Sequence, residues 1–296
     1  MQTAEPRSAL THIKFVVGGR VSALVWFVRV HPIGAVAAFA IFVMVVAAVF
    51  APWVAPADPL RISPAPLEPP SWAHLMGTDN IGRDIFSRVI YGARISLWVG
   101  FLAVAISIGA GTLIGLISGY MGGTIDLVLQ RVVDLVQAMP PLVMALALVA
   151  ILEPSATNSI IAIAIVATPG NARVVRSTVL VVKETSYVEA AKVIGCRTPR
   201  IMLRHVLPNV TAPIIVLASL GFGYAILIEA TLSFLGLGTQ PPTPSWGSML
   251  NLSQTFLERS PHLAIFPGLA ISVAVLAFNL LGDTLRDILD PKLRGR

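Results

Sequence analysis

Residues 95–125 read ISLWVGFLAVAISIGAGTLIGLISGYMGGTI, a stretch without a single charged side chain. A helix needs about 20 apolar residues to cross the hydrocarbon core of a bilayer, so this stretch predicts a membrane-spanning helix. Five further windows are nearly as apolar, at residues 33–52, 135–152, 154–172, 206–228 and 263–282. These blocks are continuous and do not alternate with period two, which favours helices over a β-barrel. We therefore predict an all-α integral membrane protein with six transmembrane helices.

The composition agrees with this class of protein. Of the 296 residues, 55% are hydrophobic and only 12% are charged, and the mean hydropathy is +0.81. A soluble domain of this length would carry more charge. The single cysteine, Cys196, excludes an internal disulfide, and no group of His, Cys, Asp and Glu has the spacing of a metal site. No metal is therefore expected.

The distribution of basic residues predicts the orientation. With six spans and the N-terminus inside, sixteen Lys and Arg residues fall in inside segments and five in outside segments. The positive-inside rule then places both termini in the cytoplasm. The basic residues flank membrane spans and no nucleic-acid motif accompanies them, so no nucleic-acid partner is expected.

The chain divides at the ends of these windows. The first window follows 32 residues and lacks a small-x-small cleavage site, so it is interpreted as a retained span. The predicted segments are a cytoplasmic tail at 1–32, a first transmembrane helix at 33–54, a proline-rich external segment at 55–94, a five-helix core at 95–282 and a cytoplasmic tail at 283–296. Within the core we expect a cytoplasmic loop at 173–205 and an external segment at 232–262.

Glycines recur every four residues in the second window, at Gly111, Gly115, Gly119 and Gly123. This spacing puts them on one helix face, where they would let another backbone approach closely.

The sequence SYVEAAKVIG at residues 186–195 predicts a short helix within the cytoplasmic loop. Ser186 and Glu189 have the spacing of a capping box, and Gly195 suits the position that ends a helix. Two interpretations stay open from the residues alone. The helix could lie on the membrane surface, or it could dock in a groove of a soluble partner.

Glu189-Ala190-Ala191, followed by Gly195 and then Leu207-Pro208, resembles the EAA loop of bacterial ABC importer permeases. In that family the loop is the coupling helix that docks on the ATP-binding subunit. The resemblance implies an ATPase-coupling role for Ser186, Tyr187, Glu189, Ala190, Ala191, Lys192, Gly195, Cys196, Arg197, Leu207 and Pro208.

Longer motifs resemble the C-type permeases of the dipeptide, oligopeptide and nickel branch. They are GTDNIGRD at 77–84, EATLSFLGLG at 229–238, QPPTPSWG at 240–247 and NLLGDTLRDILDP at 279–291. The resemblance implies the type I importer permease fold in a bacterial or archaeal cytoplasmic membrane, surrounded by lipid. It also implies a sister (B-type) permease, two ATP-binding subunits and an extracytoplasmic substrate-binding protein.

Catalysis is not expected in this chain. The sequence has no phosphate-binding loop and no nucleophile elbow, so ATP and Mg²⁺ are expected only in the partner subunits. The implied cargo is a di- or oligopeptide, with a nickel chelate or a glutathione-type peptide as the alternative. A stand-alone secondary transporter is a further alternative of a different class.

Glu229 lies near the outer end of the fifth window, with Ser233 and Phe234 one turn later. An acidic residue inside a membrane span is a candidate for function. These three residues are therefore candidates for the pathway or the outer gate, although Glu229 could instead pair or cap within the external segment.

Overall fold

The computed structural model describes residues 20–289, with side chains from residue 25 onward. The predicted tails at 1–32 and 283–296 thus lie partly outside the described residues, and so do the basic residues Arg7, Lys14, Lys292, Arg294 and Arg296.

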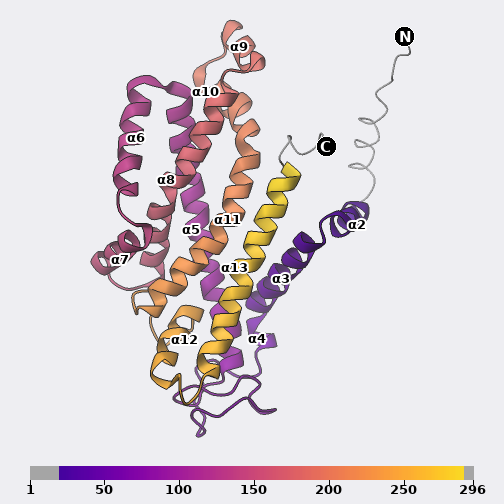
Figure 1. Ribbon diagram of the computed structural model, residues 1–296, viewed down its shortest axis with the longest axis vertical. Helices are drawn as coiled ribbons and strands as arrows, with labels where there is room; N and C mark the ends of the chain where they lie inside the picture. The colour runs from indigo at the N-terminus through magenta and orange to yellow at the C-terminus, as the bar shows by residue number, and fades with distance from the viewer. Residues whose placement is uncertain (1–19, 290–296) are drawn as a thin grey trace.

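The described chain is almost entirely helical (Figure 1). Its helices are α2 (Arg20–Val30), α3 (Pro32–Val49), α4 (Ala51–Val54), α5 (Ile85–Met121), α6 (Gly123–Gln137), α7 (Pro141–Leu152), α8 (Ala156–Val182), α9 (Ser186–Val193), α10 (Thr198–Ile201), α11 (Thr211–Phe234), α12 (Trp246–Ser253) and α13 (His262–Leu289). A π-helical turn η1 (Met202–Val206) and a 3₁₀ turn η2 (Leu207–Val210) join α10 to α11, and a second 3₁₀ turn η3 (Gln254–Phe256) follows α12.

Five helices are long and apolar enough to cross a membrane, and α6 with α7 makes a sixth if that bent pair is one span. The fold class is thus the predicted one, but the third window is not a straight helix. The axes of α6 and α7 differ by 86°. Pro140 and Pro141 follow the end of α6, and because proline lacks a backbone N–H it cannot continue a helix but readily starts one.

Two helices extend beyond the predicted apolar windows. The window at 154–172 was expected to end before Arg173, but α8 continues to Val182 and passes through Pro169. The second span begins at Ile85 rather than near residue 95, with the Asp84 carboxylate accepting a hydrogen bond from the backbone N–H of Ser87. An apolar window marks where hydropathy falls and not where a helix ends, and the non-helical part of the predicted loop at 173–205 begins only after Val182.

Helices α5 and α8 form the most extensive helix contact of the described chain. Gly111, Gly115 and Gly119 all face α8. A Cβ atom on Gly115 would lie 2.5 Å from the carbonyl oxygen of Ala172, which is closer than any real contact. Gly123 differs, because it begins α6 with φ of 55° and has open space around it. The predicted row of contacts therefore ends at Gly119.

The remaining long helices pack around this pair. Helix α11 lies against α5 and α13, where the rings of Phe222 and Phe278 stack with centroids 4.3 Å apart. Helix α3 packs on α13, and Gly34 fits against Thr284. The short helix α9 lies at one end of this bundle, and α4 and α12 lie at the opposite end (Figure 1). These are called the α9 end and the α12 end below.

Replacing Gly115 with alanine is expected to destabilise the protein by about 1–3 kcal/mol, because the added methyl group meets backbone atoms of α8 that cannot move aside. The measurement is the thermal melting of the purified protein in detergent. Gly109→Ala is the matched control on the same helix, where a Cβ atom has nothing within 4 Å. Equal melting temperatures for the two variants would contradict the close contact.

Candidate coupling loop and translocation cavity

Helix α9 is anchored by one face and exposed on the other. Val188 is fully buried and Ala191 is 4% exposed, and both pack on a cluster from α5, α8 and the segment that leads into α11. Val193 and Ile194, by contrast, are 87% and 77% exposed. These two side chains and the exposed Tyr187 are called the apolar patch below, and Figure 1 places α9 at the tip of the bundle.

The start of α9 differs from the predicted capping box. Thr185, not Ser186, is the N-cap residue, and it makes no side-chain capping bond. Its hydroxyl instead donates to the carbonyl of Val182, 2.6 Å away. Ser186 is already the first helical residue, so Glu189 lies one position too far along the helix to complete a capping box.

The end of α9 follows the prediction closely. Gly195 has φ of 78°, and its N–H donates to the carbonyl of Lys192. The N–H of Cys196 donates to the carbonyl of Ala191. This pair of bonds is a Schellman motif, which satisfies the last carbonyls of the helix and requires a residue that tolerates positive φ. A Cβ atom on Gly195 would meet nothing within 4 Å, so conformation alone explains the glycine.

The other predicted coupling residues surround α9. Glu189, Ala190 and Lys192 are exposed, and the Lys192 ammonium lies 5.9 Å from the ring centre of Tyr120. Cys196 and Leu207 are half-buried against the same cluster that holds Val188. Arg197 and Pro208 are exposed, Arg197 as the N-cap of α10 and Pro208 as the second residue of η2.

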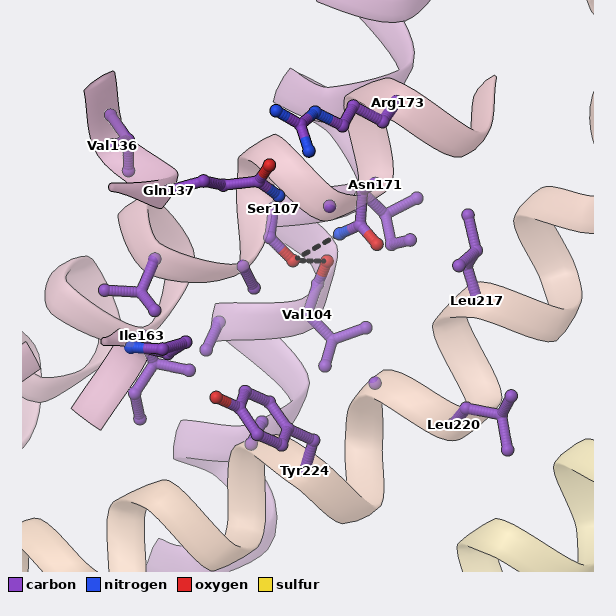
Figure 2. A pocket seen from close by; sticks show the side chains of 18 of the residues that line it. Val104, Ser107, Val136, Gln137, Ile163, Asn171, Arg173, Leu217, Leu220 and Tyr224 are labelled. Carbon is purple, nitrogen blue, oxygen red and sulfur yellow. Dashed lines mark hydrogen bonds between the residues drawn. The ribbon is translucent and has the colours of Figure 1, made fainter. Parts of the chain in front are cut away.

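A cavity of about 690 Å³ lies between α5, α6, the start of α7, α8 and α11. Most of its wall is apolar, formed by residues such as Val104, Ile163 and Leu217. Figure 2 shows the polar side chains of Gln137, Asn171 and Tyr224 in the same wall. The Asn171 amide donates to the Ser107 hydroxyl at 3.2 Å. The volume of the cavity is within the range of small-molecule sites, about 300–1,000 Å³.

Ion pairs connect α6 to α8 beside this cavity. Arg176 binds Asp126 through two parallel bonds, each 2.6 Å long, and the Ser118 hydroxyl also donates to Asp126. One turn earlier on α8, Arg173 donates to Asp134 at 2.6 Å. Asp134 and Arg173 both line the cavity, whereas Asp126 and Arg176 do not.

Glu229 lies outside this cavity, buried where α5, α11 and α12 meet near the α12 end. The hydroxyls of Ser96 and Ser233 donate to its two carboxylate oxygens at 3.0 and 2.8 Å. Each serine in turn accepts a backbone N–H, from Trp246 and Thr239 respectively. Phe234 is half-buried at the end of α11. Glu229 thus joins elements at that end, and a role of Glu229, Ser233 and Phe234 in the pathway or outer gate stays a prediction.

Sequence reasoning missed the cavity residues. Ser107, Gln137, Asn171 and Tyr224 are ordinary polar residues within or beside apolar windows, and nothing in their spacing singles them out. Arg173 carried a signal, since it follows an apolar window, but it was interpreted as a loop residue. The tertiary fold alone brings these residues together from four helices.

Glu229→Gln is expected to lower the melting temperature. The hydroxyls of Ser96 and Ser233 both donate to residue 229, so the NH₂ group of glutamine would place a donor opposite a donor and lose one hydrogen bond. Glu229→Ala should destabilise more, by about 2–4 kcal/mol, since it also leaves an empty space. Thr231→Ala is the control on the same helix turn, at a half-buried position outside the network whose hydroxyl donates only to the carbonyl of Leu227. If Glu229→Ala melted no lower than Thr231→Ala, the network would not stabilise this end.

Comparison with known proteins identifies the family. Residues 111–295 match the family described as binding-protein-dependent transport system inner membrane component. The dipeptide transport system permease protein DppC of Alkalihalophilus pseudofirmus is 49% identical, over 84% of this chain and 82% of its own length. The glutathione transport system permease protein GsiD of Pectobacterium atrosepticum is 47% identical, over 77% of this chain and 76% of its own.

Solved structures show the same fold at low sequence identity. A chain of the MetNI methionine ABC transporter, in an inward-facing conformation, superimposes with a TM-score of 0.59 at 14% identity. The match covers 70% of this chain and 98% of the transporter chain. The sequence match, the helical fold and the α9 loop agree, and this chain therefore belongs to the family of binding-protein-dependent transport system inner membrane components, as the multi-pass permease component of an ABC importer.

Proposed function

We propose that this permease imports small peptides and receives the driving force of ATP hydrolysis through α9. The observation that carries the coupling role is the exposed apolar patch of Tyr187, Val193 and Ile194 on a helix whose other face is buried. An exposed apolar patch on a rigid support is typical of a protein-docking surface. Because Val188 and Ala191 anchor α9 in the bundle, force applied to the patch reaches the membrane helices.

Peptides are the proposed cargo. The printed names of the similar permeases refer to dipeptide and glutathione transport, and glutathione is itself a short peptide. The cavity of about 690 Å³, with a mostly apolar wall and a few polar groups, suits a ligand that has apolar side chains and a polar backbone. The family membership replaces the alternative of a stand-alone secondary transporter.

The proposed assembly contains this chain and a sister (B-type) permease in the inner membrane, two ATP-binding subunits at its cytoplasmic face and an extracytoplasmic binding protein. ATP and Mg²⁺ would bind in the ATP-binding subunits, and this chain would hold no cofactor and catalyse no reaction. The α9 end would face the cytoplasm together with both termini. Support for this orientation comes from the positive-inside rule and from the basic residues at the α9 end, among them Lys183, Lys192, Arg197, Arg200 and Arg204.

Glu189→Ala is expected to weaken co-purification of the ATP-binding subunits and to reduce substrate-stimulated ATP hydrolysis by at least about tenfold. The exposed Glu189 side chain has no hydrogen bond or ion pair within the described residues, so its loss should leave the fold intact. Melting of the purified permease pair checks the fold. Unchanged docking, coupling and uptake would contradict the coupling role and leave α9 as a surface helix.

Gly195→Val tests the shape of the loop and has a matched control in Gly236→Val. Both glycines end a helix in a Schellman motif, with φ of 78° and 81°, and neither has a neighbour in reach of a Cβ atom. Each substitution should therefore strain the backbone by a similar 1–2 kcal/mol or so. Only Gly195→Val, at the α9 end, should impair binding of the ATP-binding subunits. Equal impairment by both variants would indicate general destabilisation instead.

A further inference from the structure

The wall of the cavity contains the charged pair Asp134 and Arg173, and this pair belongs to a group with more arginines than carboxylates. Asp134 lies between two arginines, with Arg173 at 2.6 Å and Arg131 at 3.8 Å. The other acidic residue of α6, Asp126, accepts hydrogen bonds from Nε and Nη2 of Arg176. Three guanidinium groups thus share two carboxylates, and the group carries one net positive charge.

Arg173 is the arginine with capacity for a further ligand. It donates to Asp134 through Nη2 alone, and no other described residue accepts a hydrogen bond from its side chain. About half of its side chain is exposed, and it lines the cavity. A guanidinium offers five N–H donors in a planar fork that matches a carboxylate, so Arg173 has donors left for a second carboxylate.

The rest of the wall has the chemistry of a peptide site. Figure 2 shows the side chains of Arg173, Gln137, Asn171 and Tyr224 in the wall of the cavity. The amides of Gln137 and Asn171 can each donate to and accept from a peptide bond. The surrounding wall is apolar and can hold the side chains of a peptide without selecting one of them. It is formed by Val104, Ile108, Ile163, Val166, Leu217 and Leu220.

We infer that this cavity is a transit site for the peptide within the membrane, and that Arg173 binds the C-terminal carboxylate of the cargo. The inference rests on the proposed function, since it assumes that the cargo is a peptide. Asp134 holds the guanidinium in place while the site is empty and keeps a lone cation from being exposed in the cavity. Because only the main-chain carboxylate and amides are recognised, the site accepts peptides of different side chains.

The test uses the complete transporter, with the sister permease and ATP-binding subunits, in nanodiscs and without the binding protein, which could impose its own preference. Equilibrium binding is measured for radiolabelled Ala-Phe with a free carboxylate and for the same dipeptide with a C-terminal amide. Wild type is expected to bind the free acid about tenfold more tightly than the amide. This factor is at the lower end of what a hydrogen bond to a charged group contributes, because Arg173 is half-exposed.

Arg173→Gln should remove this preference, and Arg173→Lys should restore part of it. Arg131→Gln is the matched control, because Arg131 also lies near Asp134 but does not line the cavity. It should keep the preference, and both variants should retain the ATP-binding subunits. Asp134→Asn should bind the free acid at least as well as wild type, since it releases Arg173.

Three results would overturn the inference. They are equal binding of acid and amide by wild type, an unchanged preference in Arg173→Gln, and an equal loss in Arg131→Gln, which would indicate only a general attraction of charge. Uptake by proteoliposomes with the binding protein present tests the peptide cargo separately from the transit site. Peptide uptake without a carboxylate preference in the nanodisc assay refutes the transit site alone. Absence of ATP-dependent uptake of either dipeptide refutes the peptide cargo and the transit site with it.

Discussion

The close approach of α5 and α8 is the contact on which the rest of the structure depends. A bilayer gives little hydrophobic gain for pressing two helices together, so contact there relies on close packing between small residues. Gly111, Gly115 and Gly119 provide it by letting the backbone of α5 touch that of α8. Helix α8 carries the cavity residues Asn171 and Arg173, and its end leads directly into α9. The glycine contact therefore positions both the cavity and the coupling loop.

The second constraint is electrostatic. Charged side chains inside a membrane are costly unless they pair or face water, and they then mark functional regions. Helix α8 carries Arg173 and Arg176 into this region, and both are paired with carboxylates on α6. The bend between α6 and α7 has a related consequence, since it brings Gln137 and the end of α6 to the cavity. Irregular backbone at membrane depth is tolerated where it lines such a cavity.

The sequence predicts the helical membrane class, the approximate spans, the glycine contact up to Gly119 and the end of α9 at Gly195. All of these depend on local rules of hydropathy, spacing and helix termination. It fails where a distant partner decides the outcome. The ion pair between Arg173 and Asp134 joins two helices that are distant in sequence, and the predicted window at 135–152 joins the end of the amphipathic α6 to the apolar α7 across the bend at Pro140. The cavity residues come from four helices, and a single sequence gives no sign that they meet.

The two ends of the bundle are built differently, and this favours a rocking motion. At the α12 end, buried Glu229 joins α11 to Ser96 of α5, and the described groups around it are bonded to one another. At the α9 end, Val188 and Ala191 hold α9 through apolar contacts, and the Lys183 ammonium donates to the carbonyl of Gly119, which joins the end of α8 to α5. Helices α5 and α11 both line the cavity between these ends. Force on α9 would then move their α9 ends while the α12 ends stay joined, so the cavity would widen or narrow about the α12 end.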